Sequence, residues 1–191
     1  MNSIHEVLVR DVLEDHAYAV SLRRHFHTFP ELSEKEYETC NKIEEELDKC
    51  GIPHKRLAKT GVYAELEGEK QGDRCILLRA DIDALPIQEE HECEYKSQRD
   101  GVMHACGHDA HTAALLSAAR VLSKNRDKFS GKIIFNFQPG EEVGYGARAM
   151  ISEGSLGEAQ RSFGIHMASN VDAGKIVLMS GPNNASVDQF K

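Results

Sequence analysis

Five histidine, cysteine and aspartate side chains lie within eight consecutive positions at the end of residues 101–111. Thiolate and imidazole groups are ligands for Zn²⁺ and similar divalent ions. His104 and His108 have the HxxxH spacing, but the Glu of the HExxH motif is missing and Gly107 lies between them, which argues against a zinc-protease helix. Cys106 and His108 instead suit a tight loop with two ligands for one site. The alternative is that the histidines cap the next helix and Cys106 is a small buried apolar residue.

Two adjacent carboxylates, Glu141 and Glu142, follow the apolar run of residues 133–137 and a Pro-Gly turn. Adjacent residues at the end of a strand point in different directions. One carboxylate can therefore hold a metal ion while its neighbour acts as a general base toward water. The alternative is a solvated acidic loop.

Two more candidates follow strand-like segments. Asp81 comes shortly after the apolar run of residues 75–78, where it can accept a hydrogen bond from a ligand imidazole and fix its tautomer. The alternative is an Asp that stabilises a local turn. His166 ends the short apolar segment 163–166, and a single His in such a position can be a ligand or a structural residue.

Together, these segments offer a mixed set of sulfur, nitrogen and oxygen ligands: Cys106, His108, Glu142 and His166. Four such ligands would nearly saturate a single ion and leave no position for water. Two ions about 3.5–4 Å apart would share them and need further ligands. The residues therefore favour a dinuclear hydrolase in which Glu141 deprotonates the water.

The elements that must position these residues alternate between strands and helices. The pattern predicts helices at residues 4–27, at 34–50 after a capping box of Ser33 and Glu36, at 112–122 after an N-cap at Asp109, and at 146–153. Strands are predicted at residues 61–66, 75–78, 132–137, 163–166 and 175–179. This order predicts an α/β three-layer sandwich with a mainly parallel, mixed central sheet, whose ligands lie beyond the carboxyl ends of the strands.

Composition narrows the class of protein. The chain has 191 residues, with 23 basic and 31 acidic side chains and a formal net charge of −8, which argues against a nucleic-acid partner. No apolar run approaches the roughly 20 residues of a membrane span, so no membrane partner is expected. Residues 1–10 lack the apolar core of a signal peptide. Five cysteines without a regular framework predict reduced thiols and a cytoplasmic protein.

Five motifs in this order resemble the metallo-amidohydrolases of the aminoacylase/carboxypeptidase group. They are RRHFHTFPELSEKE (23–36), LLRADIDALPI (77–87), GVMHACGHDAHTAALL (101–116), FQPGEEVGYGARAMISEG (137–154) and FGIHM (163–167). The most similar branch contains hippurate hydrolase, N-acyl-amino-acid amidohydrolases and indole-acetyl-amino-acid hydrolases. The resemblance implies a zinc-exopeptidase-like catalytic domain that uses two divalent ions (Mn, Zn, Co or Ni) to hydrolyse the amide bond of small-molecule N-acyl amino acids.

The resemblance also implies residue roles. Four residues match metal ligands: Cys106, His108, Glu142 and His166. Glu141 matches the general base that passes a proton to the leaving amine, and Asp81 matches the acidic residue that supports catalysis. Arg79 stands where relatives place a ligand His. His25 and His27 receive no role, and His104 and His111 are candidates for supporting the ligands.

Chains of this family are longer, because a lid and dimerisation domain is inserted into the catalytic domain. Residues 1–180 are expected to be the N-terminal portion of the catalytic domain, and residues 181–191 the start of the crossing into the lid. The chain is then an N-terminal fragment or a truncated product, weak or inactive alone, of a full-length protein that dimerises through the lid. The alternatives are a non-catalytic metal-binding module, and a di- or aminopeptidase of the same group.

Overall fold

The computed structural model describes residues 3–178 and 180–181. The helices are α1 (Ile4–Thr28), α2 (Tyr37–Lys49), α3 (His108–Ser123), the 3₁₀ turn η1 (Arg126–Lys128) and α4 (Gly146–Ser152). The strands are β1 (His54–Leu57), β2 (Gly61–Glu67), β3 (Lys70–Asp81), β4 (Ser130–Gln138) and β5 (Arg161–Gly164). Of the helices that the structure describes, not one combines the length and the apolar character that crossing a membrane requires.

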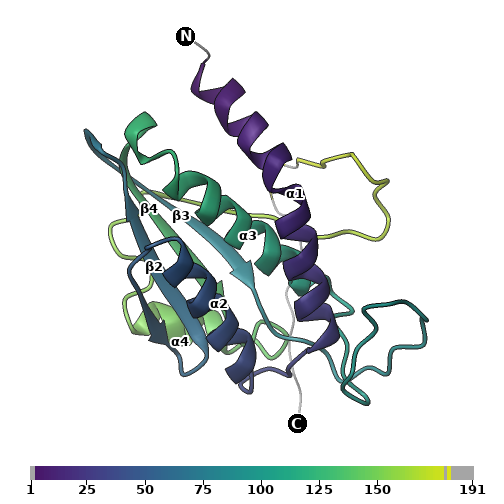
Figure 1. The fold of residues 1–191 in the computed structure, drawn as a ribbon. Coiled ribbons are helices and arrows are strands. Elements are labelled where there is room, and N and C mark those ends of the chain that lie inside the picture. Colours follow the sequence, from purple (N-terminus) through teal and green to yellow (C-terminus); the bar gives the residue numbers. More distant parts are fainter. Residues whose placement is uncertain (1–2, 179, 182–191) are drawn as a thin grey trace.

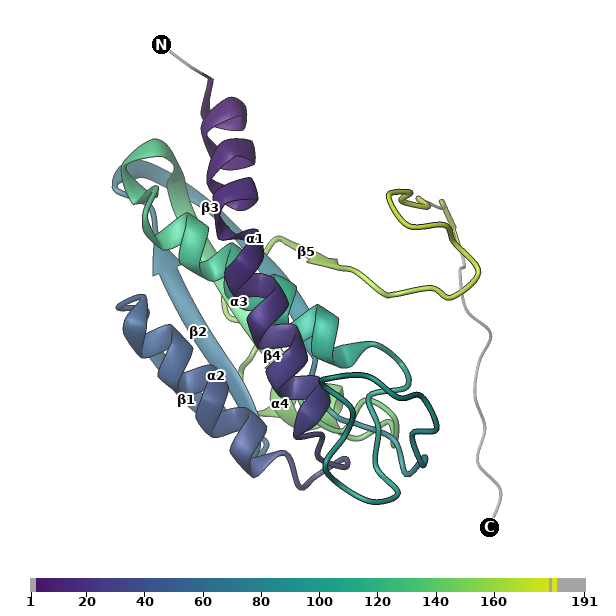
Figure 2. The same cartoon turned by 45° about the vertical axis from the view of Figure 1, so that its right-hand side comes forward.

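The five strands form one mixed sheet in the order β1-β2-β4-β3-β5 (Figures 1 and 2). β3 pairs in parallel with both β4 and β5, whereas β2 pairs antiparallel with β1 and β4. Because β3, β4 and β5 run in the same direction, their carboxyl ends meet at one edge of the sheet. The chain segments after Asp81, Gln138 and Gly164 therefore start side by side, as predicted.

Helices cover both faces of the sheet, which confirms the three-layer α/β sandwich. α1, α2 and α3 lie over one face, and α4 lies behind the other (Figures 1 and 2). The first interface buries residues such as Phe26, Ile43, Leu116 and Phe135, and the second buries Met150 of α4 among side chains of β2, β3 and β4. Burial of this apolar surface is what fixes the helices on the sheet.

The predicted capping box at Ser33 and Glu36 is wrong. Ser33 Oγ donates to Asp83 Oδ2 (2.7 Å), and Glu36 accepts hydrogen bonds from Thr60 Oγ1 (2.7 Å) and Gly140 N (2.8 Å). α2 begins only at Tyr37, and Glu36 makes no side-chain cap. Both side chains are used for contacts with distant segments instead of with the helix.

Asp109 is also not an N-cap. Gly107, with φ +83°, is the N-cap of α3, and Asp109 lies inside the first turn, where it pairs with α1. The predicted strand at residues 175–179 is not present over residues 175–178, and Met179 lies outside the described residues. The predicted crossing at residues 181–191 lies outside them as well, except for Gly181.

Candidate metal centre

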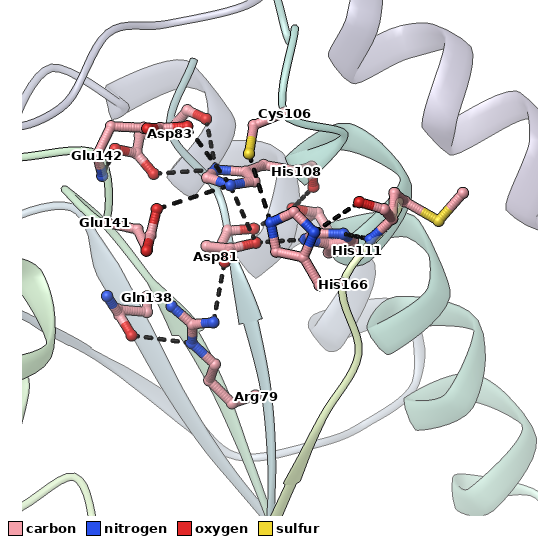
Figure 3. Close-up of polar contacts among 12 residues, drawn as sticks. Arg79, Asp81, Asp83, Cys106, His108, His111, Gln138, Glu141, Glu142 and His166 are labelled. Atoms are coloured by element: carbon pink, nitrogen blue, oxygen red, sulfur yellow. Dashed lines mark hydrogen bonds and ion pairs between the residues drawn. The ribbon is translucent and has the colours of Figure 1, made fainter. Parts of the chain in front are cut away.

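The candidate ligands lie together at the edge where the parallel strands end (Figure 3). Cys106 is in the loop before α3 and His108 is the first residue of α3, while Glu142 follows β4 and His166 follows β5. In the close-up, His108 lies between Cys106 and His166 on one side and the two glutamates on the other. The structure thus brings together side chains from four segments.

His108 is fully buried, and one of its ring nitrogens has no hydrogen-bond partner among the residues that the structure describes. Its Nδ1 lies 2.9 Å from the backbone oxygen of Asp83 and 3.2 Å from Asp83 Oδ1, so we assign the ring proton to Nδ1. Its Nε2 makes no hydrogen bond within the described part of the chain and lies 3.6 Å from Asp81 Oδ1 and 3.8 Å from Glu142 Oε1. Glu142 Oε1 is buried without a hydrogen bond there too. A buried lone pair that faces carboxylate oxygens fits a bound cation.

Cys106, before α3, and His166, after β5, lie next to each other although they are 60 positions apart in the sequence. The Sγ atom lies 3.4 Å from His166 Nε2, while His166 Nδ1 lies 2.6 Å from the backbone oxygen of Met167. Ligand atoms of Cys106, His108 and His166 lie within 4.8 Å of one another. Burial and the nearby carboxylates raise the pKa of Cys106 to about 12, so the thiol holds its proton until a cation favours the thiolate.

The two glutamates lie on the other side of His108. Glu141 Oε2 is 3.9 Å from His108 Nε2, and the backbone N–H of Glu142 donates to Asp83 Oδ2 (3.0 Å). Burial and the charges of Asp81 and Glu142 raise the pKa of Glu141. A carboxylate with a raised pKa is a better proton acceptor and then a proton donor near neutral pH.

Asp81 is buried and positions its neighbours. His111 Nδ1 lies 2.5 Å from Asp81 Oδ1, and Arg79 Nη1 lies 2.9 Å from Oδ2. Burial raises the pKa of Asp81, but the His111 hydrogen bond and the charges of His108 and Arg79 outweigh it and lower the pKa to about 2. His111 Nε2 accepts from the backbone N–H of Met167 (2.7 Å), so Asp81 and His111 together hold the segment that carries His166.

Sequence reasoning missed Asp83. Its carboxylate contacts His108, the backbone of Glu142 and the hydroxyl of Ser33. Asp81 and Asp83 are two residues apart after a strand, and in extended chain such residues face the same side. That spacing was the available signal.

The other histidines differ in their surroundings. His27 is buried between Asp109 Oδ2 (2.7 Å from Nδ1) and Glu89 Oε1 (3.1 Å from Nε2), and the Asp109 contact raises its pKa. His25 packs against the rings of Phe26 and Phe29. His104 is buried, and burial lowers its pKa to about 4.

Comparison with known proteins gives a family and several relatives. Residues 77–190 match the sequence model of the family described as Peptidase family M20/M25/M40. The N-acetyl-L-cysteine deacetylase of Bacillus subtilis (strain 168) is 47% identical over 173 residues, which cover 90% of this chain and 41% of the relative. The N-acyl-L-amino acid amidohydrolase of Geobacillus stearothermophilus is 43% identical over 185 residues, which cover 96% and 49%.

A crystal structure of a Bacillus subtilis protein described as a dinuclear metal binding peptidase from the M20 family superposes with a TM-score of 0.78. The sequences are 42% identical, and the match covers 81% of this chain and 44% of that chain. This chain thus spans about half the length of the curated relatives it matches. The match to the family model covers more than half of the chain, and the chain belongs to peptidase family M20/M25/M40.

Proposed function

We propose that this chain forms the N-terminal portion of the catalytic domain of a metal-dependent amidohydrolase that cleaves N-acyl amino acids. One observation carries the proposal. The buried Nε2 of His108 has no hydrogen-bond partner in the described residues and faces Glu142, while Cys106 and His166 lie close by. A sulfur, two imidazoles and carboxylates around one buried lone pair fit divalent ions such as Zn²⁺, Mn²⁺, Co²⁺ or Ni²⁺.

In this proposal four residues hold two ions: Cys106, His108, Glu142 and His166. When bound, such ions polarise the amide carbonyl and lower the pKa of water. Glu141 takes the proton from the attacking water and passes it to the leaving amine, and its raised pKa supports both transfers. Asp81 supports the step by holding His111 and Arg79 in place.

The proposed substrate class comes from the relatives. One is named for deacetylation of N-acetyl-L-cysteine and one for hydrolysis of N-acyl-L-amino acids. Hippurate-type substrates are a narrower possibility within that class. The similar crystal structure is described as that of a peptidase, which favours a second candidate function: hydrolysis of a small peptide at the same centre.

Because the chain spans about half of its relatives' length, the lid and a dimer formed through it are further parts of the proposal. A cytoplasmic location is also part of it, because the five cysteines lack a regular framework and fit reduced thiols. On the basis of the chain's length, we expect the 191 residues alone to be weak or inactive and to hold fewer than two ions. Robust hydrolysis by the 191 residues would contradict that expectation and exclude the non-catalytic module.

The activity test uses the gene product that contains this sequence, with N-acetyl-cysteine, hippurate and a dipeptide as substrates. Chelation should abolish hydrolysis, and Mn²⁺ or Co²⁺ should restore it. Glu141→Gln should lower kcat by roughly 10²–10⁴-fold while metal binding persists, because the amide cannot accept the proton. Wild-type rates in Glu141→Gln would rule out Glu141 as the base, and hydrolysis of the dipeptide alone would favour the peptidase.

A further inference from the structure

We propose that the junction between α1 and α2, residues 27–36, is a clamp that fixes the ligand-bearing segments before any ion binds. The proposal rests on the metal centre proposed above. It adds residues that do not bind the ion but hold the ligand-bearing segments in position. These residues lie in the RRHFHTFPELSEKE segment, to which the sequence assigned no chemistry.

The first contact of the clamp reaches the start of α3. His27, at the end of α1, is 4% exposed, and its Nδ1 lies 2.7 Å from Oδ2 of Asp109, the residue that follows His108. Its Nε2 lies 3.1 Å from Glu89 Oε1, in the long loop that leads to Cys106. Glu89 lies 17 positions before Cys106, whereas Asp109 is next to His108, so the contact with Asp109 is the one that ties a ligand-bearing segment to the end of α1.

The second contact reaches the segment after β3. Ser33 Oγ donates to Asp83 Oδ2 (2.7 Å), which also accepts from the backbone N–H of Glu142 (3.0 Å). The same carboxylate lies 3.2 Å from His108 Nδ1 through Oδ1. Ser33 thereby fixes the group that orients His108 and anchors Glu142.

The third contact reaches the turn after β4. Glu36 is fully buried, and its carboxylate accepts from Gly140 N (2.8 Å) and Thr60 Oγ1 (2.7 Å). Burying a carboxylate costs free energy. Its partner Gly140 lies two residues before Glu142, so this buried carboxylate holds the turn that presents both glutamates.

Each contact thus reaches a different segment: the start of α3, the exit of β3 and the exit of β4. The direct hydrogen-bond partners of metal ligands, such as Asp83 beside His108, typically contribute 10–100-fold to metal affinity, and the clamp acts through such groups. A clamp of this kind should therefore change how tightly the centre binds an ion, beyond any change in the stability of the fold.

The test compares two substitutions at one position. An Asn side chain places its amide nitrogen where His Nδ1 lies, and Gln places it where Nε2 lies. His27→Asn should keep the Asp109 contact and lose Glu89, whereas His27→Gln should do the reverse. Each variant removes one buried contact of His27 and keeps the other, so the two variants differ in whether the contact with α3 remains.

Co²⁺ affinity of the chain is measured by absorption, using the band that the Cys106 thiolate gives on binding. We expect His27→Gln and Ser33→Ala to weaken Co²⁺ binding by roughly 10–100-fold, His27→Asn to bind nearly as the wild type, and the control His25→Gln to be unchanged. Wild-type affinity in His27→Gln, or equal loss in both His27 variants, would overturn the clamp.

A second measurement needs no metal. Hydrogen exchange at the amides of Ala110 and His111, which donate to Gly107 O, should be faster in His27→Gln than in His27→Asn in the metal-free chain. If the wild type fails to bind Co²⁺, the proposed metal centre is contradicted, and this exchange comparison still decides the clamp. Equal exchange in the two variants would contradict it.

Discussion

The imidazole of His108 belongs to all three groups of possible metal ligands found in the described residues. Because Asp83 occupies Nδ1, only Nε2 remains, and one nitrogen binds one ion. Two ions therefore cannot both rely on His108. The second ion must draw on the remaining thiolate, imidazole and carboxylates, which is why the proposed dinuclear site needs further ligands beyond these residues.

In the proposed centre, a Cys106 thiolate ligand would favour softer ions than a site with only oxygen and nitrogen ligands does. We expect Cys106→Ser to weaken Zn²⁺ binding more than Mn²⁺ binding, because thiolate favours Zn²⁺ whereas carboxylate and water suit Mn²⁺. Titration of both ions into wild-type and variant chains measures the ratio. Equal weakening for the two metals would argue against a Cys106–metal bond.

Residue type and local spacing suggested Cys106, His108 and the glutamates, because several ligand types cluster in short segments. The roles of His27 and Ser33 could not be predicted, since their partners Asp109 and Asp83 are 82 and 50 positions away. The pattern of Ser33 and Glu36 matched a capping box locally, but hydrogen bonds to distant segments prevailed.

At the scale of elements, the start of α3 depends on Gly107. Its φ of +83° is costly for other residues, and a Cβ there would lie 2.9 Å from Met167 Cβ. Gly101 has a similar φ of +72° and open space around it. Substitution at Gly101 therefore tests backbone strain alone, whereas substitution at Gly107 adds a contact with the segment that carries His166.

We expect Gly107→Ala and Gly101→Ala each to destabilise the fold by about 1–2 kcal/mol through the left-handed backbone. Only Gly107→Ala should also weaken Zn²⁺ binding, because its methyl group pushes Met167 and hence His166 away from Cys106. Chemical denaturation and metal titration of both variants check this. Loss of metal affinity in Gly101→Ala alone would contradict it.

Glu46 of α2 accepts a hydrogen bond from Tyr18 Oη of α1 (2.8 Å) and pairs within α2 with Lys42 Nζ (2.7 Å) and Lys49 Nζ (2.8 Å). Burial raises its pKa, but these three hydrogen bonds outweigh it and lower the pKa from 4.5 to about 2. A lowered carboxylate pKa stabilises the fold above the unfolded pKa, and this contribution is lost as pH falls through the folded pKa.

Glu46→Gln should therefore cost about 1–2 kcal/mol at pH 7, and the difference from wild type should shrink between about pH 4.5 and pH 2. Glu45→Gln, which removes an exposed partner of the same lysines, should change the stability much less than Glu46→Gln does. Urea unfolding across this pH range provides the measurement. A constant difference at all pH values would show that the carboxylate charge is not responsible.

At the scale of the whole molecule, alternating strands and helices sufficed to predict the α/β sandwich, but not the antiparallel half of the sheet. β1 is short and mostly exposed, so it carries no apolar pattern. Its turn to β2 uses Ala58 (φ +50°) and Lys59 (φ +68°), where hairpins usually have Asn or Gly. The parallel half was predictable, because β3 and β4 are apolar runs that end in polar motifs.

X-ray absorption at the zinc edge of the Zn²⁺-loaded chain tests most directly whether these segments form one metal centre. We predict a sulfur neighbour at about 2.3 Å and nitrogen and oxygen neighbours at about 2.0–2.2 Å, with the sulfur lost in Cys106→Ser. A spectrum with only nitrogen and oxygen neighbours in the wild-type chain would contradict the proposed centre.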